Sequence, residues 1–384
     1  MLNLAKKQVG KVGFKNFFMA VALIVGTVVG AGVLGLPYVF AKSGFWMGVL
    51  NLVIIGAAVT LMTLFTGELA LRTKNKHQLA GFAAKYLGDK WKYVMMIVET
   101  VGIYTAIIAY LIGIGVALTS IFGTGSPVLF STLFFILSSP IIYVGIKRIG
   151  ESELWITTAK IVLLFLICFL VLPNVNLQNL ATYDWTKIFF PFGIVLFASL
   201  GYPVIPEIEH FVAGNKRRMK DVIIIAMSIV LASYFLYSFV FVGAFGTGVG
   251  EIAVTSLVEN RLLGDIFILL TMITPFIALS TVVKEVYVCD MKVDKRLSWF
   301  LAAFIPFLIF LYGKLDFITL LMISGTYSGG LMGILTCFTL MNARKKCDMK
   351  PEYVVPGGNI PIYFSIGIFV LGIAYQTLVL LGLI

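Results

Sequence analysis

The first long apolar run of the chain contains three glycines at its centre. Gly26, Gly30 and Gly32 lie within VALIVGTVVGAGVLGLPYVF, where an uninterrupted membrane helix would otherwise be expected. Each interior glycine costs about 1 kcal/mol of helix propensity relative to alanine. Backbone groups that lose their helical partners inside a membrane are tolerated only where they line a polar cavity. The run predicts a helix broken near mid-membrane, although the same glycines also suit close packing between helices.

A second apolar run is interrupted in a similar way. The stretch FPFGIVLFASLGYPVIPEI contains Gly201, Pro203 and Pro206 near its middle. Proline has no amide hydrogen and collides with the preceding turn, so the helix is expected to be kinked or unwound around 198–202. The two runs are the first and the sixth of the chain, and they occupy matching positions if it is divided into two halves of five spans. A pair of interrupted helices in matching positions indicates the binding site of a transporter.

The two breaks would expose complementary backbone groups. Unwinding the first run frees amide groups at the start of its second half, where the helix dipole attracts an anion. Unwinding the sixth run frees carbonyl oxygens, which suit an ammonium group. Donors for an anion beside acceptors for a cation fit the backbone of a free amino acid. The predicted donors are the amides of Gly30, Ala31 and Gly32, and the predicted acceptors are the carbonyls of Phe197, Ala198 and Ser199.

A few charged residues fall inside or beside apolar runs. Lys160 lies in WITTAKIVLLFLICF, about six residues or 9 Å past the interface. An ionisable group at that depth is a candidate functional residue, but a lysine stem also reaches back toward the interface. Glu99 is a second candidate titrating group or a partner of Lys160, with an ordinary buried ion pair as the alternative. Glu68 precedes Arg72 by four residues and is predicted to form a local ion pair.

The elements that would position these residues are apolar membrane spans. The chain is 60% hydrophobic and only 12% charged, which is typical of an integral membrane protein. Reading for runs of about 20 apolar residues predicts an all-α protein with eleven spans. The connection HQLAGFAAKYLG has helical spacing and is expected to lie along the membrane surface. The predicted spans are 16–41, 45–72, 91–121, 127–147, 153–173, 187–211, 220–246, 262–289, 296–312, 315–342 and 360–383.

The distribution of basic residues orients these spans. With the N-terminus in the cytoplasm, 24 of the 29 Lys and Arg residues fall on the cytoplasmic side, four fall outside, and Lys160 lies within a span. This asymmetry predicts a cytoplasmic N-terminus and, with eleven spans, an outer C-terminus. The net charge of +11 is therefore explained by topology and by contact with the lipid bilayer, and we expect no nucleic-acid partner.

The first span also carries a family resemblance. The segment GTVVGAGVLGLPYVFAKSGF resembles the signature of amino-acid permeases of the amino acid/auxin and aromatic amino-acid types, within the amino acid–polyamine–organocation superfamily. The stretches GELALR and PEIEHF and the region of Tyr110 are similar to the same families. The resemblance covers nearly the whole chain, but only the first-span motif is specific.

The resemblance implies a LeuT-type fold of two inverted five-helix repeats. The repeats would cover about 16–173 and 187–342, and an extra helix would follow at about 360–383, in a single transmembrane domain. Substrate and coupling ion would lie between the first, third, sixth and eighth spans. Further residues expected to line the substrate site are Tyr104, Phe197, Ser199, Tyr202, Thr274 and Ser324.

The resemblance is compatible with two coupling ions, a proton or a sodium ion. In proton-coupled relatives, a lysine in the fifth span stands where sodium-coupled relatives bind their ion, which makes Lys160 a proton site; burial also lowers the pKa of a lysine toward neutrality. The competing sodium pattern would use carbonyls in the first span and carbonyl and hydroxyl oxygens in the eighth. Hydroxyls in a membrane helix often bond their own backbone instead, and two cations would not share the pocket, so protons are favoured. The sodium pattern comprises Gly26, Val29, Ile277, Ser280 and Thr281.

The sequence thus predicts a secondary transporter of amino acids in the cytoplasmic membrane. The substrate is expected to be neutral or aromatic, because no acidic residue is required in the pocket. We expect no cofactor, no metal site and no enzymatic activity, since no set of paired carboxylates or nucleophile and base is present. The open alternatives are sodium-coupled symport and an amino-acid sensor built on a transporter fold. The sequence does not indicate an oligomeric state.

Overall fold

A computed structural model describes residues 14–74, 77–145, 150–208, 211–212, 215–314 and 316–383, and every regular element in these ranges is helical. The α-helices are α2 (Phe14–Val28), α3 (Gly32–Ser43), α4 (Phe45–Arg72), α5 (Leu79–Leu87), α6 (Asp89–Phe122), α7 (Pro127–Val144), α8 (Gly150–Val171), α9 (Phe192–Ser199), α10 (Ile205–Ile208), α11 (Arg218–Phe245), α12 (Arg261–Glu285), α13 (Lys295–Trp299), α14 (Ile305–Tyr312), α15 (Phe317–Ile323), α16 (Gly330–Lys345) and α17 (Ile360–Leu380).

Short 3₁₀ and π-helical turns connect several of these helices. The 3₁₀ turns are η2 (Leu172–Asn174), η3 (Leu177–Leu180), η4 (Trp185–Lys187), η5 (Tyr202–Val204), η6 (Gly246–Gly248) and η7 (Ala253–Ser256), and the π-helical turns are η8 (Val286–Asp290), η9 (Phe300–Phe304) and η10 (Ser324–Gly329).

The predicted spans correspond closely to these helices. Nine helices in the described ranges are long and apolar enough to cross a membrane, and α2 with α3 adds a tenth as a bent pair. The predicted sixth span, 187–211, is different. Its apolar helical part, Phe192–Val204, is shorter than a spanning helix, because the chain leaves helical geometry at Leu200 and Gly201. The N-terminal lysines Lys6, Lys7 and Lys11, which helped to predict orientation, lie outside the described residues.

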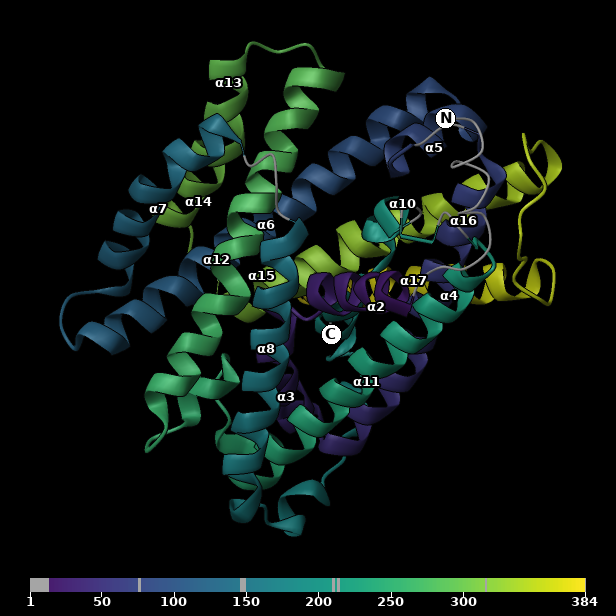
Figure 1. Cartoon of the computed structure of the whole chain (residues 1–384). Coiled ribbons are helices and arrows are strands. Elements are labelled where there is room, and N and C mark those ends of the chain that lie inside the picture. Colours follow the sequence, from purple (N-terminus) through teal and green to yellow (C-terminus); the bar gives the residue numbers. More distant parts are fainter. Residues whose placement is uncertain are drawn as a thin grey trace.

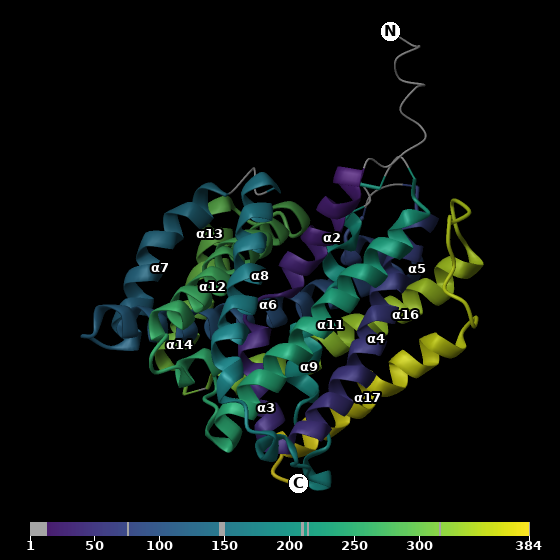
Figure 2. The same cartoon turned by 60° about the horizontal axis from the view of Figure 1, so that its bottom comes forward.

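Two groups of helices lie on either side of the long helix α6. α6 packs against α12, α7, α14 and α5, whereas α11 packs against α2, α3, α4 and α8. Both views show α7 and α12–α14 on one side of the molecule and α4, α11, α16 and α17 on the other (Figures 1 and 2). The broken helices α2–α3 and α9 belong to the second group and contact each other directly.

A buried carboxylate joins α4 to α16 and to the segment that follows α16. Glu68 is fully buried and accepts hydrogen bonds from Arg72 at 3.0 and 2.9 Å and from Arg344 at 2.9 and 2.8 Å. The amide of Val355 donates to the same carboxylate at 2.9 Å. The predicted pair of Glu68 with Arg72 is confirmed, and the structure adds Arg344, 276 residues away in sequence. This cluster holds the end of α4 against α16 and the 346–358 segment.

Candidate substrate and ion site

The first helix of the chain breaks at residues 29–31, as its glycines predict. α2 ends at Val28, α3 begins at Gly32, and the axes of the two helices differ by 56°. The amide of Gly30 turns back to the carbonyl of Val28 at 2.9 Å. The amides of Ala31 and Gly32 have no backbone acceptor among the described residues. Because the first amides of a helix lack partners within it, these two remain as donors at the N-terminus of α3.

The second break follows α9. The helix ends at Ser199, and Leu200 and Gly201 separate it from η5. Pro203 lies four residues after Ser199 and has no amide hydrogen, so the Ser199 carbonyl loses its helical donor. The carbonyl of Phe197 accepts from the Leu200 amide at 3.3 Å. The hydroxyl of Ser199 is also buried and has no hydrogen-bond partner in the described part of the chain.

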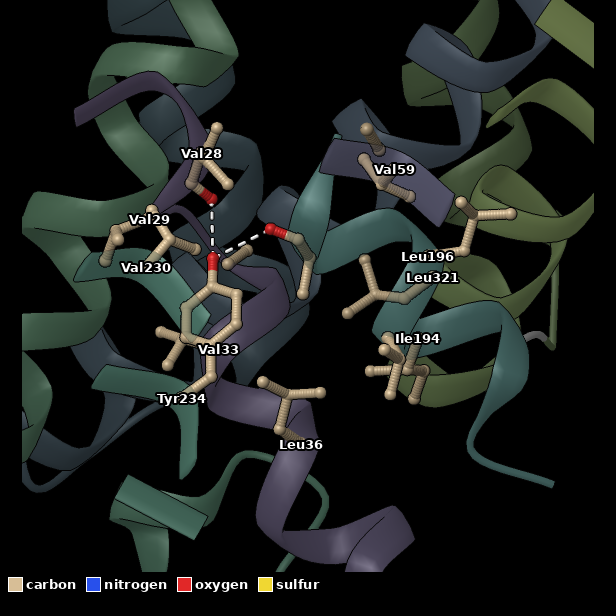
Figure 3. Close-up of a cluster of buried hydrophobic side chains, with 14 of the residues drawn as sticks. Val28, Val29, Val33, Leu36, Val59, Ile194, Leu196, Val230, Tyr234 and Leu321 are labelled. Carbon is tan, nitrogen blue, oxygen red and sulfur yellow. Dashed lines mark hydrogen bonds between the residues drawn. The ribbon is translucent and has the colours of Figure 1, made fainter. Parts of the chain in front are cut away.

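A tyrosine from α11 joins the two breaks. Tyr234 is fully buried, and its hydroxyl oxygen lies 2.8 Å from the carbonyl oxygen of Val28 and 2.7 Å from that of Ala198. Figure 3 shows the ring between α3 and the end of α2, with its hydroxyl directed at both carbonyls. A tyrosine hydroxyl has one hydrogen to donate, so the two carbonyls share it. The Ala198 carbonyl, predicted as a free acceptor, is therefore partly occupied by the protein itself.

The two breaks also touch through their backbones. A Cβ atom added to Gly32 would lie 2.6 Å from the Cα atom and 2.7 Å from the Cβ atom of Ala198. Only a glycine allows so close an approach of α3 to α9. Gly30, two residues earlier, has the opposite environment, because nothing lies within 4 Å of an added Cβ atom. The structure thus has tight packing at Gly32 and open space at Gly30.

This contrast predicts different effects for two alanine substitutions. Gly32→Ala should lower the free energy of unfolding by about 1–3 kcal/mol, because the backbone of Ala198 has to move. Gly30→Ala should leave stability unchanged but raise the KM for transport, since its methyl group enters the open space beside the free amides. Thermal unfolding and uptake kinetics of the purified variants measure both effects. Equal destabilisation by the two substitutions would contradict this assignment.

The predicted tyrosines bond within the protein. The hydroxyl of Tyr202 donates to the Gly329 carbonyl of η10 at 2.7 Å. The hydroxyl of Tyr104 donates to the Leu301 carbonyl at 2.7 Å and lies 2.9 Å from the hydroxyl of Tyr287. Tyr104 is thereby bound to η8 and η9, whereas Tyr202 joins the second break to η10. Among the other predicted lining residues, the Ser324 hydroxyl donates to the Gly102 carbonyl of α6 at 2.9 Å.

Lys160 lies inside the protein on a face of α8 that adjoins the first helix. Its side chain is only 4% exposed. Thr157, one turn earlier, packs directly against α2, because a Cβ atom on Gly26 would lie 2.0 Å from the Thr157 hydroxyl oxygen. Lys160 and Thr157 are both buried and three residues apart, so they share this face. Glu99 on α6 is partly buried and within electrostatic range of Tyr202 at the second break.

The predicted sodium ligands have mixed environments. The Thr281 hydroxyl donates to the Ile277 carbonyl at 2.8 Å, so these two groups satisfy each other. The Ser280 hydroxyl is fully buried and has no hydrogen-bond partner within the described ranges. Val29 is fully buried in the break of the first helix.

The acidic residue Glu209 and the neighbouring His210, at the end of the predicted sixth span, lie outside the described residues.

Sequence reasoning missed Tyr234 as part of this site. The stretch ASYFLYSFVF places two tyrosines in an apolar span, and a buried tyrosine hydroxyl usually needs a partner. That signal identifies both Tyr234 and Tyr237 as candidates but cannot select between them. Only the packing of α11 against α2 and α9 brings one of the two hydroxyls to the breaks.

Curated relatives of the chain are transport proteins. It is 24% identical over 378 residues to a tyrosine-specific transport system 2 of Haemophilus influenzae, covering 91% of this chain and 93% of the relative. It is 24% identical to a tyrosine-specific transport system 1 of the same organism and spans about half the length of that relative (54%), with 56% of this chain aligned. A glutamine transporter 2 of Aliivibrio fischeri is 25% identical over 60% of this chain and 61% of the relative.

The fold has a solved counterpart. The crystal structure of MhsT in complex with L-phenylalanine matches 95% of this chain and 98% of the other, with a TM-score of 0.68 and 15% sequence identity. At this identity the match establishes a common fold. The all-helical architecture is therefore shared with that protein.

The match that assigns the chain to a protein family covers nearly its whole length. Residues 14–376 match the tryptophan/tyrosine permease family. This match confirms the predicted resemblance to aromatic amino-acid permeases and agrees with a protein that is not an enzyme. Together with the apolar spans, it identifies a multi-pass protein of the inner membrane. The chain belongs to the tryptophan/tyrosine permease family.

Proposed function

We propose that the chain is a secondary active transporter that carries a neutral or aromatic amino acid across the cytoplasmic membrane, driven by protons. The observation that carries this proposal is the meeting of two broken helices at Gly32 and Ala198. The free amides of Ala31 and Gly32 suit the carboxylate of an amino acid, and the carbonyl of Ser199 suits its ammonium group. The open space at Gly30 lies beside these groups. Two relatives are named for tyrosine transport, one matched over 54% and the other over 93% of its length, and they favour an aromatic substrate.

The proposed topology has eleven spans. The ten apolar spans of the described ranges become eleven if α9, η5 and α10 are counted together as one broken helix. The chain would then comprise two inverted repeats, 16–173 and 187–342, followed by α17, in the LeuT-type arrangement. The N-terminus would lie in the cytoplasm and the C-terminus outside, in agreement with the distribution of lysine and arginine.

Lys160 is the proposed proton carrier. It is buried on the face of α8 that packs against α2, one turn from the contact of Thr157 with Gly26. A buried lysine is able to bind and release a proton during a transport cycle when a change in its surroundings makes the neutral form accessible. Movement of α2 against α8 would change the environment of this ammonium group and thereby couple protonation to the first break.

Sodium coupling is the second candidate. It is favoured by the buried Ser280 hydroxyl, which has no hydrogen-bond partner among the described residues and would suit a cation. Carbonyl groups of Gly26, Val29 and Ile277 would complete the site, with Thr281. The pairing of Thr281 with Ile277 weakens this candidate, because both oxygens already share a hydrogen bond.

Uptake into proteoliposomes tests both the function and the ion. We expect labelled tyrosine, tryptophan or phenylalanine to accumulate against its gradient when the outside is acidic. In Lys160→Ala, accumulation should disappear while exchange of labelled for unlabelled substrate persists, because exchange needs no net proton movement. Lys187→Ala is the matched control, since Lys187 is an exposed lysine, with its side chain 52% accessible.

The outcomes separate the alternatives. Full activity of Lys160→Ala under a sodium gradient, without pH dependence, would refute proton coupling and favour the sodium site. Saturable binding without accumulation under either gradient would refute transport and indicate a sensor.

A further inference from the structure

A basic cavity lies between the ends of α5 and α16, far in sequence from the two breaks. Its volume is about 280 Å³. α5 packs against both α6 and α16, and both views place α5 and α16 next to each other on the right of the molecule (Figures 1 and 2). Among the described residues, no carboxylate lines the cavity itself, although Asp348 pairs with Lys85 at its edge. The lining residues are Lys85, Tyr86, Asn342, Lys345 and Lys346.

The cavity has an excess of positive charge. The Lys85 ammonium forms an ion pair with Asp348, which uses one of its three donors. Lys345 and Lys346 are exposed, and neither has an acidic partner among the described residues. The Asn342 side chain donates to the Tyr86 carbonyl at 3.0 Å and so holds α16 against the end of α5. The two unpaired ammonium groups are therefore available to an anionic ligand.

An exposed apolar stripe on α16 leads to this cavity. Leu331 is 37% and Phe338 is 45% exposed, and Ile334 between them is partly exposed. At 100° per residue these three side chains lie on the same face of α16 as Asn342 and Lys345. Leu331 lies about 16 Å along the helix from Asn342. The stripe is thus long enough to follow much of a lipid acyl chain below the charged cavity.

Aromatic residues mark the depth of the cavity in the membrane. Trp91 and Tyr93 follow α5 at the start of α6 and are 44% and 51% exposed. Exposed tryptophan and tyrosine are enriched at the level of the lipid headgroups.

Lysines in the last turn of a helix also stabilise it through the helix dipole, but this role requires neither a cavity nor an apolar stripe beside it.

From these observations we propose that the cavity binds the headgroup of an anionic phospholipid. Lys345 and Lys346 contact the phosphate, Lys85 adds a third ammonium group, and an acyl chain lies along Leu331, Ile334 and Phe338. Basic pockets between helices at the interface are suited to anionic headgroups. The site is separate from the proposed amino-acid site and does not depend on transport.

Lipid titration of the full-length protein in detergent tests this proposal. Native mass spectrometry should show phosphatidylglycerol bound in preference to phosphatidylcholine. In Lys345→Gln/Lys346→Gln the affinity for phosphatidylglycerol should fall about 30-fold, from the loss of two charges near the headgroup. The matched control is Lys187→Gln/Lys314→Gln, which removes two exposed lysines from segments predicted on the other face and should leave the affinity unchanged.

A second variant distinguishes a lipid from a free anion. Phe338→Ser should weaken binding of phosphatidylglycerol without changing any charge, and inorganic phosphate should compete poorly with the lipid. Equal binding of the two lipids, or unchanged affinity in the double lysine variant, would overturn the site. Tight binding of inorganic phosphate, with phosphatidylglycerol unaffected by Phe338→Ser, would overturn the lipid assignment.

Discussion

Substituting phenylalanine for Tyr234 is expected to slow transport about 10- to 100-fold and to lower the free energy of unfolding by about 1–3 kcal/mol. The hydroxyl lies 2.8 Å from the Val28 carbonyl oxygen and 2.7 Å from the Ala198 carbonyl oxygen, in a fully buried position. Phenylalanine keeps the ring but leaves buried carbonyl groups without this donor. The two breaks would then lose the group that sets their relative position, and small displacements of a binding site have large effects on rate.

The neighbouring tyrosine provides a matched control. Tyr237 lies on the same helix and is also fully buried, but its hydroxyl has no hydrogen-bond partner among the described residues. Tyr237→Phe removes the same atom and should leave stability unchanged or raise it by about 1 kcal/mol, because a buried unsatisfied group is lost. Chemical unfolding and initial uptake rates of the two variants measure the difference. If both substitutions behave alike, the bridge formed by Tyr234 has no role in transport.

Replacement of Glu68 by glutamine is expected to lower the free energy of unfolding by about 3–5 kcal/mol. The carboxylate is fully buried between Arg72 and Arg344, whose side chains are only 10% and 14% exposed. Glutamine has a similar shape but no charge, so two buried guanidinium groups would face each other without a counterion. The amide of Val355 would also compete for the single remaining acceptor oxygen. We expect the 346–358 segment to detach from α4, with faster trypsin cleavage after Lys346.

Two further variants test whether the loss of stability comes from the buried ion pairs of Glu68. Glu68→Gln/Arg344→Met removes both partners of the longer-range pair and should recover part of the lost stability, as a double-mutant cycle detects. Lys187→Ala breaks the exposed pair with Asp184, whose side chains are 52% and 36% accessible, and should leave stability essentially unchanged. A loss after Glu68→Gln no larger than that after Lys187→Ala would show that the buried cluster does not stabilise the fold.

Much of the fold was predictable because its signals are local. A membrane span is recognised from the hydropathy of its own residues, and the range 45–72 coincides with α4. The breaks were predictable for the same reason, since Gly30 and Pro203 act on the backbone within one turn of their own position. The sixth span was expected to be long enough to cross the membrane, but its uninterrupted helix ends at Ser199. How far a helix unwinds at a glycine or proline depends on the contacts that neighbouring helices make with the unwound segment.

The partners of individual side chains were not predictable. Tyr104 was predicted to line the substrate site, but the pattern within its own span does not show that its hydroxyl bonds to Leu301 and Tyr287, which are 197 and 183 residues away. Tyr234 was not expected to matter, because its two acceptors are 206 and 36 residues away. Such pairs depend on how helices rotate and tilt against one another, which the pattern within one span does not specify.

The sequence by itself determined the class of this protein, its apolar spans and the positions of its two breaks. These properties follow from side-chain hydropathy and from the conformational limits of glycine and proline, which act within a few residues. Only the tertiary structure decided that Gly32 meets Ala198, that one tyrosine joins both breaks, and that Glu68 holds Arg344. Each of these contacts joins segments distant in sequence, and its geometry is set by the packing of whole helices.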